Sequence, residues 1–235
     1  MHHQVPRLIA LASVLLAATA AAQDAPPNTS VGDTHDGHLV GGAELPRSGP
    51  GFHWETNRGN PGARYGATTL VDALQAAAAS VLAAHPGSDL AIHDIALRDG
   101  GPIRGHGSHR SGRDVDIAYY ARTPDGAPMN PTRSIWFVSG GRERGAPAAT
   151  GATFHAERTF AFLRALLTDR TIRVSHVFMA PHLQRLVLAA GGRDAAVPDL
   201  RRVLRRPRGR RVDPHADHFH VRIHCPPSDT RFCED

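Results

Sequence analysis

Apolar residues recur every three or four positions in several stretches of the chain, the spacing that places side chains on one face of an α-helix. The clearest case is residues 68–84, in which Leu70, Leu74 and Val81 share a face before Pro86 interrupts the pattern. The same pattern predicts further helices over residues 154–167, 181–189 and 199–206.

Short runs of alternating or β-branched apolar residues predict strands between these helices. They cover residues 89–97, 115–120, 135–138, 172–180 and 219–223. Helices and strands therefore mix without a regular β-α-β alternation, which favours the α+β class. We expect a single domain with a small, largely antiparallel sheet flanked by helices, since 235 residues suffice for one domain with its own core.

The N-terminal segment has the features of a secretory signal peptide. Arg7 precedes an apolar run at residues 8–18, and small residues lead to Ala22, so residues 1–22 are predicted to be removed by cleavage after Ala22. The apolar run is too short for a transmembrane helix, and no later segment is long and apolar enough to span a bilayer. The mature protein is therefore expected to be periplasmic or secreted.

The segment that follows is expected to be a linker. Residues 23–40 are polar and lack periodicity, which predicts a disordered linker. Residues 41–67 are rich in Gly, Pro and Arg but contain aromatic residues, so they are expected to form an ordered loop on the core or part of a substrate groove. The folded domain is then expected to cover residues 41–235.

Two cysteines, Cys225 and Cys233, lie close together near the C-terminus. Disulfides persist in the compartments to which signal peptides lead. We therefore expect a disulfide between them. The alternative, that both bind zinc, is disfavoured because a stronger set of candidate ligands lies elsewhere in the chain.

The chain is basic, and its 27 positively charged residues are all arginine, against 22 acidic residues. Seven of these arginines lie within residues 199–211, where Leu200 and Leu204 keep helical spacing, so a core-packed helix with a solvated basic face is favoured over a polymer-binding segment. A basic exported protein suits an anionic polymer such as cell wall. Nucleic acid suits the charge but not the compartment, so no nucleic-acid partner is expected.

A histidine and a carboxylate, His109 and Asp116, lie seven residues apart around Gly112, which tolerates the positive φ of a tight turn. Asp116 falls on the predicted strand after this turn, and strand alternation would place Asp114 on the same side. Asp114 could therefore bind a metal or orient a ligand from behind it. His106 is a further candidate for such a supporting role, although a loop histidine bonded to the backbone is the simpler interpretation.

A second histidine group lies about a hundred residues later. His218 and His220 are two residues apart at the last predicted strand, so their side chains face the same way. One of them can bind a metal while the other stands beside the attacking water. His215 follows Pro214, and the pattern does not determine its direction. If the strand already includes Asp217, its side chain would point away from the histidine pair, and Asp217 is the weakest candidate.

The two motifs together supply histidines and a carboxylate, the ligand set of a hydrolytic zinc site. Catalytic zinc takes three protein ligands and leaves a fourth position to water. The pair of motifs therefore predicts a metallohydrolase with zinc at the edge of the sheet, although other first-row metals can occupy such sites.

The same residues resemble a known family. The run HGSHRSGRDVDI at residues 106–117, preceded by GGPI at residues 100–103, is similar to the metal motif of the penicillin-insensitive murein endopeptidases. The run HADHFHVR at residues 215–222, followed by Cys225, is similar to the C-terminal motif of that family. Weaker similarity extends from about residue 41 to Cys233. The family belongs to a wider group with the lysostaphin-type peptidases, the D-Ala-D-Ala carboxypeptidases and the hedgehog signalling domain.

The resemblance implies an α+β fold around a small antiparallel sheet, with one zinc ion per chain bound by His109, Asp116 and His220. It implies that His218 and His215 are catalytic histidines beside the activated water. It also implies that the substrate is peptidoglycan and that the bond cut is the D-alanyl–meso-diaminopimelyl crosslink.

The leading hypothesis is a zinc-dependent D,D-endopeptidase in residues 41–235 that hydrolyses these crosslinks by a metal-activated water. His218, or else His215, would take the proton of the water and deliver it to the leaving amine, while the other would stabilise the oxyanion. One alternative is a D,D-carboxypeptidase or dipeptidase acting on uncrosslinked stems. Another is a non-catalytic zinc-containing module that binds the wall. The sequence does not indicate an oligomeric state.

Overall fold

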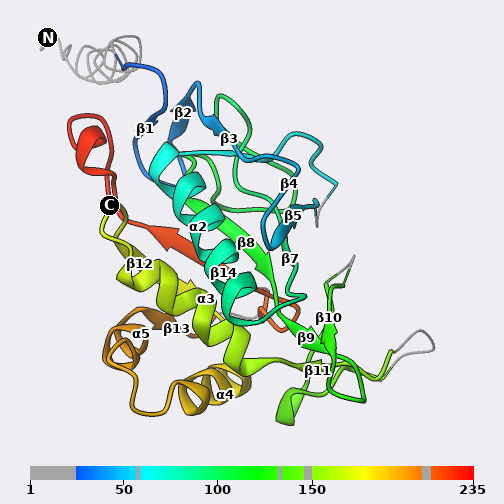
Figure 1. Cartoon of the computed structure of the whole chain (residues 1–235). Helices are drawn as coiled ribbons and strands as arrows, with labels where there is room; N and C mark the ends of the chain where they lie inside the picture. The colour runs from blue at the N-terminus through cyan, green and yellow to red at the C-terminus, as the bar shows by residue number, and fades with distance from the viewer. Residues whose placement is uncertain (1–24, 57–58, 132–133, 146–149, 208–212) are drawn as a thin grey trace, which may run out of the picture.

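Two long helices cover one face of a central sheet. The computed structural model describes residues 25–56, 59–131, 134–145, 150–207 and 213–235. Helices α2 (Thr68–Ala84) and α3 (Ala156–Thr168) lie side by side over the sheet (Figure 1). Helices α4 (Pro181–Gly191) and α5 (Val197–Val203) pack against α3. The arrangement confirms the predicted α+β class.

The central sheet has seven strands among the described residues, in the order β13-β12-β14-β8-β7-β5-β4. The pairings of β12 with β13 and of β5 with β7 are parallel, and the other pairings are antiparallel. The prediction of a largely antiparallel sheet is therefore confirmed. The strands are β4 (Ser48–Gly49), β5 (Phe52–Trp54), β7 (Leu90–Ile92), β8 (Asp114–Ala118), β12 (Val174–Phe178), β13 (Leu204–Arg205) and β14 (His218–Ile223).

Smaller sheets surround the central one. Strand β1 pairs with β2, β3 pairs with β6, and β9 lies between β10 and β11. Two short 3-10 turns, η1 (Ser139–Gly141) and η2 (Pro227–Asp229), complete the described elements. The strands are β1 (Thr29–Val31), β2 (His38–Val40), β3 (Ala43–Glu44), β6 (Tyr65–Gly66), β9 (Ala121–Arg122), β10 (Pro128–Met129) and β11 (Thr153–Phe154).

The predicted helices agree with the structure more closely than the predicted strands do. Helix α2 has the predicted bounds, whereas α5 is shorter than expected because Leu204 begins β13. Of the strand predicted over residues 89–97, only β7 forms, and Ile95 instead donates its N–H to the carbonyl of Ala63 at 2.7 Å. Residues 135–138 do not form a strand, since Phe137 makes only an isolated bridge with Glu143.

The segment predicted as a disordered linker differs most from expectation. From Thr29 to Val40 the chain forms the antiparallel pair β1–β2. The Ser30 hydroxyl donates to the carbonyl of Ser111 at 2.7 Å, and the Ser30 N–H donates to Asp229 Oδ2 at 2.8 Å. These polar contacts order the segment without apolar periodicity, which is why its pattern resembled a linker.

Two further predictions concern membranes and export. The predicted signal peptide, residues 1–22, lies outside the described residues. Among the residues that the structure describes, no helix is long and apolar enough to cross a bilayer.

Strand alternation gives β8 and β14 one apolar face and one polar face. The odd-numbered residues join the hydrophobic core that contains the apolar side chains of α2 and α3, namely Val115, Ile117, Phe219, Val221 and Ile223. The even-numbered residues face the other way, and most of them line a groove. The polar functional groups therefore project from the side of the sheet that faces away from α2 and α3.

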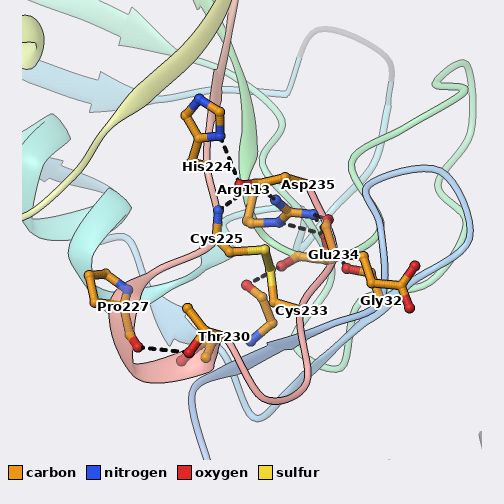
Figure 2. Close-up of a disulfide and its surroundings, with 12 residues drawn as sticks. Gly32, Arg113, His224, Cys225, Pro227, Thr230, Cys233, Glu234 and Asp235 are labelled. Atoms are coloured by element: carbon orange, nitrogen blue, oxygen red, sulfur yellow. Dashed lines mark hydrogen bonds and ion pairs between the residues drawn. A yellow bond between two sulfur atoms is a disulfide. The ribbon is translucent and has the colours of Figure 1, made fainter.

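The predicted disulfide between Cys225 and Cys233 is confirmed (Figure 2). It closes a loop beside Arg113, whose side chain is only 2% exposed. Arg113 Nη1 donates to Asp235 Oδ1 at 3.0 Å, and Arg113 Nη2 donates to the carbonyl of Gly32 at 3.3 Å. Because Arg113 directly precedes β8, the disulfide loop and the β1–β2 hairpin together hold the start of that strand.

The double variant Cys225→Ser, Cys233→Ser should lower the free energy of unfolding by about 2–3 kcal/mol, because the bridge no longer restricts the short loop in the unfolded chain. Urea denaturation followed by circular dichroism measures the change. The wild-type protein in reductant is the control and should unfold like the double variant. An unchanged midpoint in both samples would contradict a stabilising role for the disulfide.

Candidate active site

Three side chains bring potential ligand atoms to one point on the polar face of the sheet. His109 Nε2 lies 3.4 Å from Asp116 Oδ1 and 3.2 Å from His220 Nδ1. His220 Nδ1 lies 3.0 Å from Asp116 Oδ1. The register of β14 with β8 pairs His220 with Asp116, while His109 comes from the loop before β8. The three side chains are almost completely buried.

The geometry of this triangle suits a metal ion. Ligand atoms held at zinc–nitrogen and zinc–oxygen distances in a tetrahedron lie roughly 3.3–3.4 Å apart. The observed separations of 3.0, 3.2 and 3.4 Å are close to that value. Two imidazoles and one carboxylate also match the donor types of catalytic zinc sites. The sequence predicted the site at the sheet edge, whereas these residues lie on and beside two central strands, β8 and β14.

His109 and His220 each have one ring nitrogen that faces the triangle, the inner nitrogen, and one that faces away from it, the outer nitrogen. Each outer nitrogen contacts an oxygen acceptor. His109 Nδ1 donates to the carbonyl of Ile95 at 2.8 Å, and His220 Nε2 donates to Asp114 Oδ1 at 2.9 Å. Because these oxygens only accept, each outer nitrogen donates a proton to its partner. Burial lowers the pKa of His220, but the Asp114 and Asp116 carboxylates more than compensate and raise it to about 9, so a metal bound at the triangle would displace a proton from its inner nitrogen. Metal-binding histidines characteristically have such partners.

Asp114 lies behind the triangle and connects its parts. It is fully buried, and its Oδ2 accepts the backbone N–H of His109 at 3.0 Å. Arg222 Nε donates to Asp114 Oδ1 at 2.7 Å. Burial would raise the pKa of Asp114, but the adjacent His220, His109 and Arg222 hold it well below its usual range. The carboxylate is therefore ionised and holds the His220 ring from behind.

Two site histidines have unusual backbone conformations. Within the described ranges, the non-glycine residues with positive φ are Asn28, His109 (φ 70°) and His215 (φ 52°). This left-handed region is costly for residues other than glycine, and such strain is concentrated at functional sites. Gly112 has φ 71°, as expected for the turn between His109 and Asp116.

His218 lies beside the triangle with its ring anchored by a carboxylate. Its Nδ1 donates to Asp217 Oδ1 at 2.7 Å, and its Nε2 lies 3.7 Å from Asp116 Oδ2. Burial lowers the pKa of His218, but Asp116 and Asp217 more than compensate and raise it. Asp217 was expected to point away only as part of the strand, and β14 instead begins at His218, so Asp217 belongs to the preceding bend.

His215, whose direction the sequence did not determine, also faces the groove. Its ring centroid lies 4.8 Å from that of His218. Its Nδ1 donates to the carbonyl of Asp213 at 2.7 Å, and its own carbonyl accepts the Tyr119 hydroxyl at 2.8 Å. Burial, reinforced by the nearby His218 and His220, lowers the pKa of His215 to about 4. This histidine is therefore neutral near pH 7.

His106 contacts two carboxylates rather than the backbone. Its Nε2 lies 3.0 Å from Asp94 Oδ2, and its Nδ1 lies 3.5 Å from Asp116 Oδ2. Together with His109 and Asp116 it forms a group that could hold a metal ion. His220 is a further candidate for the third ligand, because its Nδ1 lies 3.0 Å from Asp116 Oδ1, closer than the 3.5 Å between His106 Nδ1 and Asp116 Oδ2.

The site opens into a groove of about 1170 Å³. One wall comes from β12, where the rings of His176 and Phe178 stack with centroids 5.8 Å apart. The exposed arginines Arg205 and Arg206 also line the groove. Such a groove can accommodate a peptide beside the histidines.

The model of the penicillin-insensitive murein endopeptidase family matches residues 30–235. The chain belongs to this family. None of the curated proteins matches the chain. A murein endopeptidase is a peptidase whose substrate is peptidoglycan, and this substrate together with the disulfide fits an extracytoplasmic location. The match begins at residue 30, so it includes the β1–β2 hairpin that the sequence assigned to a linker.

Sequence reasoning missed several residues of this murein endopeptidase site. Asp217 was considered only as a residue that would point away if the strand included it, and its position next to His218 was the available signal. Asp94 and Asn60 were not considered, although Asp94 Oδ2 accepts hydrogen bonds from Asn60 and His106. Neither belongs to a metal-ligand motif, so no spacing in the sequence identified them.

The variant Asp114→Asn should weaken zinc binding by about 10–100-fold, because an amide cannot replace the carboxylate behind His220 and beside Arg222. Competition with a chromophoric chelator measures the affinity. Asp217→Asn is the matched control, since Asp217 lies behind His218 rather than behind a candidate ligand, and its affinity should equal that of the wild type. Equal losses in both variants would contradict this arrangement.

Proposed function

We propose that the protein is a zinc-dependent D,D-endopeptidase that hydrolyses D-alanyl–meso-diaminopimelyl crosslinks of peptidoglycan. One zinc ion per chain would be held by His109, Asp116 and His220. The observation that carries this proposal is the triangle of inward-facing atoms, 3.0–3.4 Å apart, whose histidines have their outer nitrogens occupied by oxygen acceptors. Membership of the murein endopeptidase family supplies the substrate class.

Zinc, when bound, would act as a Lewis acid on the scissile carbonyl and on the attacking water. The side chains next to it must then move a proton from the water to the leaving amine. His218 and His215 are the candidates, because both line the groove beside Asp116.

His218 is the better proton carrier. Its Nδ1–H is donated to Asp217, so Nε2 is the nitrogen that accepts a proton, and the carboxylate stabilises the resulting imidazolium. The water oxygen forms the new bond to the carbonyl carbon of D-alanine while His218 takes one proton from the water. The C–N bond then breaks, and His218 returns that proton to the leaving nitrogen. The products are a D-alanine carboxyl group and a diaminopimelyl amine.

His215 is suited to a different task. Its Nδ1–H donates to a main-chain carbonyl. Burial is the largest of the causes that lower its pKa to about 4. His215 therefore remains neutral near pH 7, and its Nε2 is an acceptor. It can accept a hydrogen bond from the water or from the leaving amine. An oxyanion requires a donor. The geometry therefore argues against the oxyanion-stabilising role that the sequence left open for the second histidine.

The variants His220→Ala and Asp116→Ala should lose zinc and activity together, because each removes a ligand. His218→Ala should keep its zinc but lose about 10²–10⁴-fold in rate, the range for general acid–base groups. Metal analysis and digestion of purified crosslinked muropeptide dimers measure the two quantities. His85→Ala, at the end of α2 and outside the groove lining, is the control and should retain both. A fully active His218→Ala would refute the assignment.

Purified crosslinked sacculi, digested with and without a chelator and analysed by mass spectrometry, test the activity itself. We expect chelator-sensitive loss of D-alanyl–diaminopimelyl dimers with accumulation of monomers. Because no acyl-enzyme forms, a β-lactam should not slow the digestion. Loss of terminal D-alanine with intact dimers would instead identify a carboxypeptidase. Binding of zinc-loaded protein to sacculi without any turnover would identify a wall-binding module.

A further inference from the structure

A buried polar cluster contacts His106 at Nε2, the ring nitrogen opposite the one that faces Asp116. Its centre is Asp94, which is fully buried and belongs to neither histidine motif. Asp94 Oδ2 accepts a hydrogen bond from Asn60 Nδ2 at 2.7 Å and another from His106 Nε2 at 3.0 Å.

Asn60 also fixes the loop that carries His106. Its Nδ2 donates to the carbonyl of Arg104 at 3.0 Å, and its Oδ1 accepts the Arg104 N–H at 3.2 Å. Its own N–H donates to Thr56 Oγ1 at 2.8 Å. Asn60 thus connects the Asp94 carboxylate to the backbone two residues before His106, so the ring and the loop are held together.

The Asp94 contact determines which nitrogen of His106 faces the groove. A carboxylate only accepts, so Nε2 carries the proton of the neutral ring and Nδ1 is left as an acceptor. That Nδ1 lies 3.5 Å from Asp116 Oδ2, and the ring centroid lies 4.3 Å from that of His109. His106 therefore presents a lone pair to the groove beside the second oxygen of Asp116.

Stability alone gives a poor account of this cluster. Burying a carboxylate is costly unless it is fully compensated. Within the described residues, Asp94 Oδ1 has no hydrogen-bond partner, and the ion pair of Asp94 there is with His106. A buried polar atom without a partner in the protein calls for an explanation such as strain, a catalytic role, or a bound water or ion. What the buried Asp94 carboxylate provides is a fixed orientation of the His106 ring.

We propose that Asp94 and Asn60 are positioning residues for the hydrolysis, acting through His106. Asp94 sets the tautomer and the direction of the His106 ring, and Asn60 holds both Asp94 and the His106 loop in place. The inference rests on the proposed function for its effect on rate, but the effect on the His106 ring is independent of turnover.

The variant Asp94→Ala tests the proposal with two readouts. Long-range ¹H–¹⁵N NMR of the imidazoles should show the Nε2–H tautomer of His106 in the wild type and a tautomer mixture in the variant, with or without zinc. On crosslinked dimers, kcat should fall roughly tenfold or more while KM and the zinc content stay close to wild type. Asn60→Ala should change both readouts in the same direction. It replaces Asp94→Ala as the test variant if Asp94→Ala does not fold.

Asp89→Ala is the matched control. It removes another Asp–His hydrogen bond, which joins Asp89 Oδ2 to His53 Nδ1 at 2.9 Å. Neither of these two residues lines the groove. It should leave kcat and the His106 tautomer unchanged. A folded Asp94→Ala or Asn60→Ala protein with wild-type kcat, or with the His106 tautomer retained, would overturn the proposal. So would a rate loss fully explained by loss of zinc. If the wild type cleaves no crosslinks, the proposed function fails, and the NMR result still decides whether Asp94 positions His106.

Discussion

The buried carboxylate of Asp114 joins the two halves of the candidate metal site. One oxygen holds the backbone of His109, and the other holds the ring of His220 and the guanidinium of Arg222. His109 and His220 are 111 residues apart in the chain, yet their facing nitrogens are 3.2 Å apart. The β8–β14 register supplies the proximity, and Asp114 supplies the orientation. A displaced Asp114 would leave a correct sheet with incorrectly directed ligands.

Five histidines around Asp116 share one arrangement of their rings, namely His106, His109, His215, His218 and His220. Each has its outer ring nitrogen bonded to an oxygen and its inner nitrogen directed toward the groove. The acceptor is a main-chain carbonyl for His109 and His215, and a carboxylate for the other three. A carboxylate partner makes an imidazole more basic, whereas a carbonyl mainly sets its direction. The choice of acceptor therefore gives chemically identical side chains different surroundings within one site.

The sequence was sufficient where the physical signal is periodic or local. Helix α2 and the polar face of β8 follow from spacing, and the resemblance placed His109, Asp116 and His220 together. It was insufficient where order depends on distant polar partners. The β1–β2 hairpin is held by contacts such as that of Ser30 with Asp229, 199 residues away, and it has no apolar period. Asp94 likewise gains its contact with His106 only when the loop that carries His106 folds over it. The direction of Asp217 was left conditional, because one residue of strand length decides which way it points.

The sequence separation of these contacts also constrains how the molecule folds. The central pairing of β8 with β14 joins segments about a hundred residues apart, and the bridge of Gly32 with Cys233 joins segments about two hundred residues apart. Contacts of this kind cost loop-closure entropy before they contribute stability, so folding is expected to be slow compared with a helical domain of equal length. The helices can form early from local interactions. The candidate active site cannot form early, because His218 and His220 lie on β14 near the end of the chain. A partly synthesised or partly folded chain therefore has no assembled site, and catalytic competence appears only with the complete sheet.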